Sequence, residues 1–279
     1  MAEQPSSRDA VLARIAEYEK LGLFDRDVED DPPTRVLTPE EISYDFSGLG
    51  CRIRTELANV AARTYFDGEI RRNRLILDGA EGLAHFRALS GGAVLTCNHF
   101  HPYDNYAIYK VLQKDLRKRH QNLWKVIREG NYTNFPGLYG YFFRNCNTLP
   151  LSANPAVLKK MLRGTETLLR QGEKVLIYPE QGMWWNYRKP RPLKAGAFLL
   201  AVRANVPVLP IFITLRDSTH LDADGYAVQA MTLHFMAPVV SDPTLSEKAN
   251  MRRMAEMVYG QMKDKYEQVY GIPLTYEEA

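Results

Sequence analysis

The stretch that decides the fold lies at residues 93–104 and reads AVLTCNHFHPYD. Its first four residues form a short apolar run that follows a turn at Gly91 and Gly92, which is typical of a buried strand. His99 comes just after this run, and Asp104 stands at the start of a predicted helix. In open α/β sheets, ligands bind beyond the carboxyl ends of the strands. The stretch therefore predicts a parallel sheet with a site at the end of this strand.

A second stretch has the same form. The predicted strand from Lys174 to Tyr178, which is apolar from Val175 on, is followed by Glu180, Gln181 and Gly182. Parallel strands bring their carboxyl ends to one edge of a sheet. We therefore expect Glu180 to lie beside His99, although the two are far apart in sequence.

Working outward, short apolar runs alternate with stretches of helical spacing from about residue 75 onward. This alternation predicts an α/β fold, with a mostly parallel central sheet flanked by helices and an N-terminal helical region. The predicted strands lie at 75–77, 93–96, 124–127, 174–178, 208–214 and 231–235. The predicted helices lie at 80–89, 104–117, 154–170, 193–204 and 246–270, the last with Met254, Met257 and Val258 facing the core.

We expect residues 1–67 to form a helical region with a linker, and residues 68–279 to form the α/β domain. Thr38, Pro39 and Glu41 have the pattern of a capped helix start, with Thr38 as the N-cap. The N-terminal region is therefore predicted to contain a helix over 7–22, an acidic linker over 25–33, a helix starting at Thr38 and a helix over 50–66.

Composition limits the classes of function. The chain has 279 residues, of which 45% are hydrophobic and 25% charged, as in ordinary folded proteins. A net charge of +3 gives no support for nucleic-acid binding, and three cysteines without ligand spacing give none for a metal. We find no run of about 18 apolar residues that could span a bilayer. We expect a cytoplasmic protein that attaches to the cytoplasmic membrane face from its surface, if at all.

His99 is the lead candidate for proton transfer, because imidazole titrates near neutral pH. Asp104 can bind the other ring nitrogen, which fixes the tautomer and stabilises the imidazolium. The alternative is a structural loop histidine followed by an aspartate that only caps a helix. His101 lacks the same spacing to Asp104, and Cys97 belongs to a strand where cysteine usually packs. We therefore expect His99 and Asp104 to be catalytic.

The stretch at residues 180–194 reads EQGMWWNYRKPRPLK. Its cations are candidates for binding a phosphate, and its aromatic residues for contacting lipid or lining an acyl channel. The alternative is a solvated basic loop whose aromatic side chains pack on the core. The candidate substrate-binding residues are Glu180, Gln181, Gly182, Trp184, Trp185, Arg188, Arg191 and Lys194.

These motifs together resemble the glycerolipid acyltransferase family, typified by lysophosphatidic acid acyltransferase. Residues 98–104 resemble the family's first block, the HxxxxD motif, and residues 136–151 resemble its second. Residues 179–182 resemble its Pro-Glu-Gly-Thr block, and residues 206–210 its closing Val-Pro-x-x-Pro block. The resemblance runs from about Leu75 to Thr214 and keeps the order of the blocks.

Two family arginines are missing. Gln181-Gly182-Met183 stands where the third block has Gly-Thr-Arg, and Ser152 stands where the second block ends in arginine. Both arginines belong to recognition of the acceptor phosphate in the family. Arg188 or Arg191 is a candidate replacement, and the identity of the acceptor stays open.

The resemblance implies an O-acyltransferase of phospholipid biosynthesis that needs no metal or redox cofactor. His99, held by Asp104, would deprotonate the hydroxyl of a lysophospholipid such as 1-acylglycerol 3-phosphate. The oxygen would attack the thioester of acyl-CoA or of an acyl carrier protein, with Glu180 orienting the acceptor. Two alternatives remain: a different acceptor, such as an amino-lipid, a glycolipid or another alcohol, and a non-catalytic lipid-binding protein of the same fold.

Overall fold

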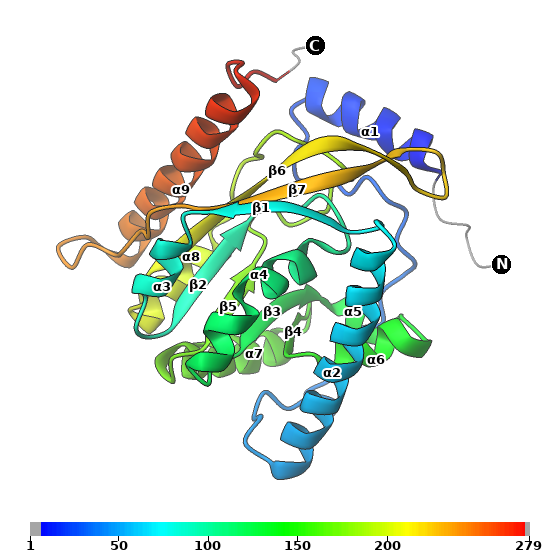
Figure 1. Ribbon diagram of the computed structural model, residues 1–279. Coiled ribbons are helices and arrows are strands. Elements are labelled where there is room, and N and C mark those ends of the chain that lie inside the picture. Colours follow the sequence, from blue (N-terminus) through cyan, green and yellow to red (C-terminus); the bar gives the residue numbers. More distant parts are fainter. Residues whose placement is uncertain (1–6, 277–279) are drawn as a thin grey trace.

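The centre of the molecule is a twisted sheet (Figure 1). Within residues 7–276, which this computed structural model describes, the sheet has seven strands in the order β1-β7-β6-β2-β5-β3-β4. Neighbouring strands are parallel except β6 and β7, which are antiparallel. The predicted α/β fold with a mostly parallel sheet is thus confirmed. The strands are β1 (Ile76–Glu81), β2 (Ala93–Cys97), β3 (Leu123–Arg128), β4 (Thr148–Leu151), β5 (Lys174–Ile177), β6 (Val208–Leu221) and β7 (Ala227–Phe235).

Helices cover both faces of the sheet, which explains why its central strands are apolar throughout. Val94 and its neighbours on β5 and β6 pack against the side that carries α7, α8 and α9. Leu95, one residue on, belongs to the core formed with α3 and α4 on the other side. The helices are α1 (Arg8–Lys20), α2 (Leu49–Arg71), α3 (Leu83–Ala88), α4 (Asp104–Lys118), α5 (Glu129–Thr133), α6 (Gly137–Asn145), α7 (Pro155–Arg170), α8 (Gly196–Ala204) and α9 (Glu247–Tyr270).

Strand register brings the two predicted motifs together. β2 and β5 are parallel neighbours, and Thr96 pairs with Ile177. His99 and Glu180 each follow three residues after these partners. The two side chains therefore leave the same edge of the sheet at the same level, as the sequence predicts.

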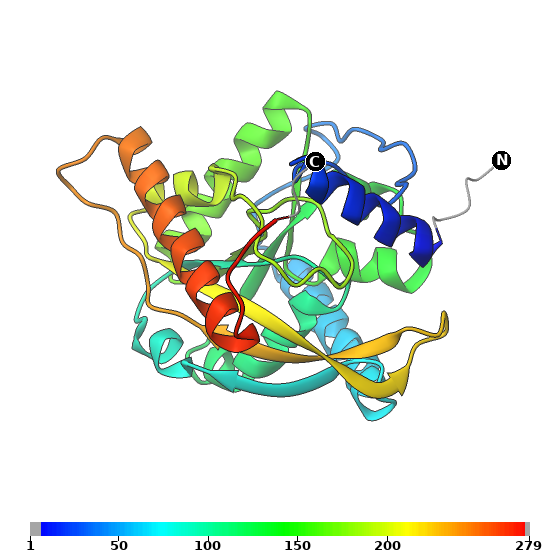
Figure 2. The same ribbon diagram turned by 90° about the horizontal axis from the view of Figure 1, so that it is seen from above.

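The hairpin of β6 and β7 extends beyond the other strands toward α1 (Figures 1 and 2). At its tip, Asp224 Oδ2 lies 3.8 Å from Arg8 Nε. Val11 and Ile15 of α1 are buried in a cluster with Trp184 and Trp185. The first helix is therefore a docking helix over the loop that follows β5.

The prediction of a helix that starts at Thr38 is wrong, because no helix forms there. The capping bond does form, since Thr38 N donates to Glu41 Oε2 at 2.9 Å, but the chain makes only a turn there. Ile42 and Tyr44 beyond the turn are both buried, and this alternation belongs to an extended chain. Tertiary packing therefore overrides a local helix signal.

The structure also differs from the prediction in which helix faces are buried and in how far some elements extend. Met257 of α9 was expected in the core but is 43% exposed. On α2, Ala58 and Ala62 are buried, whereas Ile53 and Leu57 are 54% and 62% exposed. α2 also runs beyond its predicted end to Arg71, and α6 and β4 form within a stretch for which no element was predicted. Among the helices within residues 7–276, none combines the length and the apolar character that a bilayer span requires.

Candidate active site

The loop after β2 is fixed by Asn98. Its buried side-chain amide donates to the carbonyl of Ile213 at 3.0 Å, and its oxygen accepts from the Ile213 N–H at 2.9 Å. Both bonds reach β6, the neighbour of β2 on the other side from β5. The point at which the chain leaves the sheet is therefore held rigidly, one residue before His99.

His99 and Asp104 form the predicted pair. Nδ1 of His99 lies 2.7 Å from Oδ2 of Asp104. Asp104 is fully buried and is the first residue of α4, where the helix dipole favours a negative charge. Since Nδ1 is occupied, Nε2 is the nitrogen left to act on a substrate. The pair has the geometry of a general base with its orienting carboxylate.

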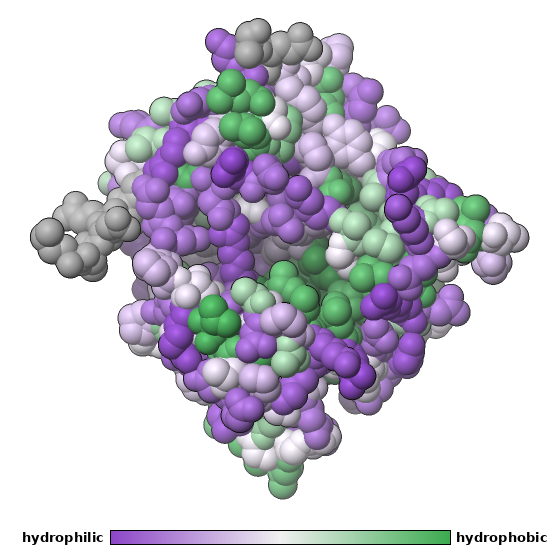
Figure 3. All heavy atoms as spheres, turned by 180° about the vertical axis from the view of Figure 1, so that it is seen from behind, coloured by the Kyte–Doolittle hydropathy of each residue, from purple (hydrophilic) through white to green (hydrophobic). Residues whose placement is uncertain are grey.

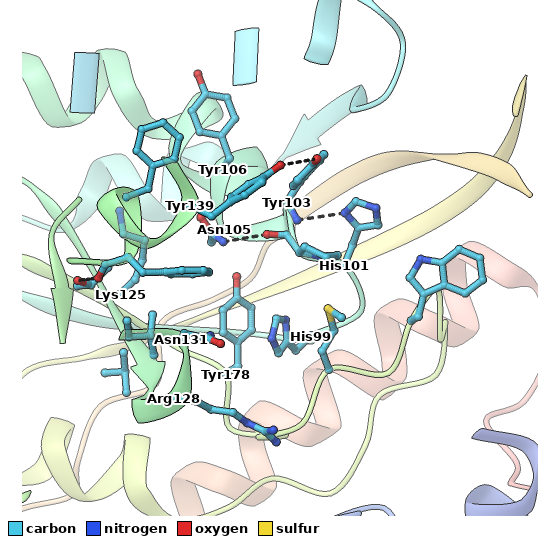
Figure 4. Close-up of a pocket in the computed structure, with 18 of the residues that line it drawn as sticks. His99, His101, Tyr103, Asn105, Tyr106, Lys125, Arg128, Asn131, Tyr139 and Tyr178 are labelled. Atoms are coloured by element: carbon cyan, nitrogen blue, oxygen red, sulfur yellow. Dashed lines mark hydrogen bonds between the residues drawn. The ribbon is translucent and has the colours of Figure 1, made fainter. Parts of the chain in front are cut away.

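Tyr178 completes this arrangement, although it was not among the predicted site residues. Its hydroxyl donates to Oδ1 of Asp104 at 2.6 Å, and its ring stacks on the His99 ring with centroids 4.1 Å apart. Burial raises the pKa of Tyr178 well above its usual value, and the Asp104 charge adds to this effect. The hydroxyl therefore stays protonated as a donor. Both oxygens of Asp104 are engaged, so the imidazole is held at its edge by Asp104 and on its face by Tyr178. Figure 4 shows Tyr178 beside His99.

Glu180 lies beside His99 but faces protein groups. Its Oε2 accepts from the His99 backbone N–H at 3.2 Å, and its Oε1 accepts from the Arg191 backbone N–H at 2.9 Å. The Arg191 guanidinium lies 3.1 Å from Oε2, and both side chains are almost fully buried. Glu180 therefore ties the His99 loop to the loop after β5.

Arg191 is enclosed on all sides. Besides Glu180, its guanidinium donates to the carbonyls of Gly182 and Phe24 and lies 4.7 Å from the centre of the Trp184 ring. Burial lowers its pKa, and the Glu180 charge opposes that effect. Trp184 is fully buried, and its Nε1 donates to the Arg26 carbonyl at 3.0 Å. Arg191 and Trp184 thus hold the loop together, and neither lines the cavity.

The other predicted substrate-binding residues are dispersed. Arg188 pairs with Asp217 at 2.6 Å on the β6–β7 hairpin and does not line the cavity. Lys194 does line it, 3.5 Å from Asp25. Gln181 and Trp185 also line it, whereas Gly182 packs so closely against the N-terminal segment that an added Cβ would lie 2.8 Å from Asp27 Oδ1. The predicted cationic cluster therefore does not form as one group.

Cys97 and His101, the alternatives to His99 as the reactive side chain, both lie in surroundings that make them unreactive. Cys97 is fully buried, and burial raises the pKa of its thiol well above the usual value, so little thiolate exists at neutral pH. Burial also lowers the pKa of His101 to about 4. His101 Nδ1 accepts from the Tyr103 N–H at 3.1 Å. His101 is therefore a neutral acceptor at neutral pH.

A cavity of about 1320 Å³ opens beside His99. Its walls are mixed, with apolar and aromatic side chains such as Ile127, Leu162 and Phe142 alongside polar ones. Figure 4 labels part of this lining, including Tyr139 and Asn131. The face of the molecule turned away in Figure 1 is hollowed, with hydrophobic residues on one side of the hollow and hydrophilic ones on the other (Figure 3). The volume of about 1320 Å³ exceeds the roughly 300–1,000 Å³ that is typical of small-ligand pockets. Such a cavity suits a long amphipathic substrate.

Arg128 at the end of β3 lines this cavity and was also missed. It pairs with Asp27 and, at 3.0 Å, with Asp31, both in the predicted acidic linker. Ser152, which stands in the place of a family arginine, is buried and donates to Glu129. The sequence signal for Arg128 was its place at the end of a predicted strand, on the same edge as His99 and Asp104.

Comparison with known proteins agrees with this geometry. A family model described as Acyltransferase matches residues 74–214, just over half of the chain. Among solved structures, the 1-acyl-sn-glycerophosphate (LPA) acyltransferase PlsC from Thermotoga maritima matches with a TM-score of 0.50 and 21% sequence identity. The match covers 83% of this chain and 92% of that one, and it shows a likeness of fold. A search of curated proteins gives no match.

Proposed function

Since the chain belongs to the acyltransferase family, we propose that it moves a fatty acyl group from a thioester to the hydroxyl of a lysophospholipid, most simply 1-acylglycerol 3-phosphate. The observation that carries this proposal is the His99–Asp104 pair with Tyr178 at the mouth of a large cavity. A general base with an orienting carboxylate is what direct transfer to a hydroxyl requires.

The reaction follows from these groups. Nε2 of His99 takes the proton of the acceptor hydroxyl while Asp104 stabilises the imidazolium. The acceptor oxygen attacks the thioester carbonyl, and the resulting tetrahedral intermediate expels the thiolate as the C–S bond breaks. The imidazolium then returns its proton to the thiolate sulfur. The step is balanced without a metal or a redox cofactor, and the donor is acyl-CoA or an acyl carrier protein.

Glu180 has a positioning role in this proposal. It accepts the His99 backbone N–H, so it sets where the imidazole stands. Because Arg191 is buried against Glu180, loss of activity on changing Arg191 would not identify a phosphate ligand. Arg128 and Lys194 are two of the cations that line the cavity, and replacing each of them tests phosphate binding.

The cations considered for phosphate binding are already paired with carboxylates, and this favours a second class of acceptor. Arg128 and Lys194 both face carboxylates of the N-terminal segment, and Arg188 faces Asp217. A phosphate would have to displace one of these partners. An acceptor without a phosphate, such as a glycolipid or another lipid alcohol, needs no such displacement.

Contact with a membrane surface is part of the proposal. Leu49, Ile53 and Leu57 are exposed on α2 at intervals of four residues, which places them along one stripe of the helix. α2 also contributes Asn59, Ala62 and Phe66 to the cavity wall. A helix that touches lipid with one face and the cavity with another suits an enzyme with lipid substrates. We propose a cytoplasmic protein that attaches peripherally to the cytoplasmic face of the membrane.

The decisive assay is thiol release from palmitoyl-CoA by the purified protein, with and without lysophosphatidate. We expect acceptor-dependent release that His99→Ala abolishes and that the matched control His220→Ala, an exposed hairpin residue, leaves unchanged. Release with a lipid alcohol but not with lysophosphatidate would select the second acceptor class. Release that persists in His99→Ala would refute the mechanism.

A further inference from the structure

The cationic side chains around the cavity differ in whether a carboxylate lies nearby. Among the described residues, six cationic side chains line it, and five of them lie within 4.0 Å of a carboxylate. Lys125 is the exception: within residues 7–276 its Nζ has no carboxylate in that range and no hydrogen bond. The five paired residues are Arg8, Arg63, Arg74, Arg128 and Lys194.

Lys125 sits where an unpaired charge is costly. Its backbone is held in the sheet, because its N–H donates to the Asn147 carbonyl at 2.8 Å. Its side chain is partly buried and lines the cavity, and burial lowers its pKa. The titratable group that acts on it is Cys146, which belongs to an apolar cluster with Ala62 and Phe142. A desolvated ammonium in such surroundings is a candidate for binding an anionic ligand.

Lys125 lies far from the reacting end of the cavity. It pairs with Leu176 on β5, which in turn pairs with Leu95 on β2, so it is level with a residue four positions before His99. Two strand spacings across and four residues along give a backbone separation of roughly 16 Å. Figure 4 shows Lys125 on the other side of the cavity from His99. A phosphate next to a hydroxyl held at His99 would stay near that end.

We propose that Lys125 binds a carboxylate at the far end of a substrate's chain, while the reacting thioester or hydroxyl stands at His99. The substrate would then carry a long chain that ends in a carboxylate and not in a methyl group. Either the acyl donor or the acceptor can supply that chain. The inference rests on the proposed function only in placing the reacting group at His99.

A binding experiment tests the proposal without catalysis. Hexadecanoate and hexadecanol have the same chain and differ in one charge, and each is added below its aggregation concentration at neutral pH. We expect the protein to bind hexadecanoate roughly tenfold or more tighter, as for a buried charge pair. Lys125→Met should remove that ratio and Lys125→Arg should retain it. Lys114→Met, a change on α4 outside this cavity, should leave it unchanged.

Two outcomes overturn the proposal: equal binding of the two probes by the unchanged protein, or a ratio that survives Lys125→Met. The second result would place the carboxylate at another cation, such as Lys194 or Arg128. Thermal unfolding of each variant shows whether it is folded, and Lys125→Gln, which also removes the charge, replaces the methionine variant if that one is not.

Kinetics then identify which substrate carries the group. Palmitoyl-CoA is compared with 15-carboxypentadecanoyl-CoA as donor, and lysophosphatidate with its chain-terminal carboxylate analogue as acceptor. In either the donor pair or the acceptor pair, we expect the unchanged protein to prefer the member with the terminal carboxylate and Lys125→Met to prefer the uncharged member. Equal losses for charged and uncharged members of both series would contradict the proposal. Charge-selective binding that depends on Lys125 in a protein without transfer activity would instead leave this inference standing and refute the proposed function.

Discussion

The buried ion pair of Glu180 and Arg191 gives the sharpest test of how the loop that carries His99 is held. Removing one partner of a buried ion pair leaves the other charge uncompensated, at a cost of about 3–5 kcal/mol. Glu180→Gln should therefore lower the free energy of unfolding by about that amount, measured by urea denaturation. This is a large share of the roughly 5–15 kcal/mol typical of a folded domain.

The same pair predicts strong coupling. Glu180→Gln combined with Arg191→Met removes both charges, so the double variant should be more stable than the sum of the two single changes predicts, by about 1–3 kcal/mol. Arg188→Met is the matched control, because Arg188 lies in the same loop but its pair with Asp217 is exposed. Exposed pairs contribute at most about 1 kcal/mol.

The activity of the enzyme should depend on how precisely His99 is positioned. We expect Glu180→Gln to lower kcat more than it raises KM, because Glu180 holds the His99 backbone and does not line the cavity. The reasoning is refuted if Glu180→Gln is no more destabilising than Arg188→Met, or if the effects of the two buried changes are additive. A rise in KM alone would instead make Glu180 a substrate ligand.

Three further predictions concern other parts of the molecule. Tyr178→Phe removes a charge-assisted hydrogen bond to Asp104 worth about 1.5–3 kcal/mol, so kcat should fall roughly tenfold or more, and an unchanged kcat would show that the hydroxyl has no role. Burial lowers the pKa of Lys174 to about 8, below its unfolded value of about 10.4, so the folded state loses this proton first and the free energy of unfolding should rise between about pH 8 and 10. Lys174→Met should remove that rise, and urea titrations that show the same pH slope in both proteins would contradict the assignment. Leu57→Glu should reduce co-sedimentation with anionic lipid vesicles, and undiminished binding would place any membrane contact elsewhere than on α2.

The contact between His99 and Asp104 could be predicted because its determinants are local. A buried strand, a loop and a helix start bring His99 and Asp104 together within a few residues, and strand register places Glu180 beside them. The roles within the 180–194 loop could not be predicted in the same way. Whether Arg191 faces a substrate or the protein depends on the Phe24 carbonyl, which lies 167 residues away in sequence.

The errors in the helical regions have a similar cause. The capping bond at Thr38 forms, yet Ile42 and Tyr44 are drawn alternately into the core and keep the chain extended. On α2 the helical period was visible, but the small residues Ala58 and Ala62 are the ones that pack. Periodicity identifies a helix, and only the neighbouring elements decide which of its faces is covered.

The loop that carries Trp184 and Arg191 is clamped by residues from both ends of the described chain. Phe24 accepts from Arg191 and lies 4.7 Å, ring to ring, from Tyr276, whose hydroxyl donates to the Pro190 carbonyl. Contacts of such long sequence separation close large loops and form late in folding. During synthesis, the segment around Phe24 must therefore wait for nearly the whole chain to emerge. We expect the sheet to form first and the loop that positions His99 to become ordered in the last step.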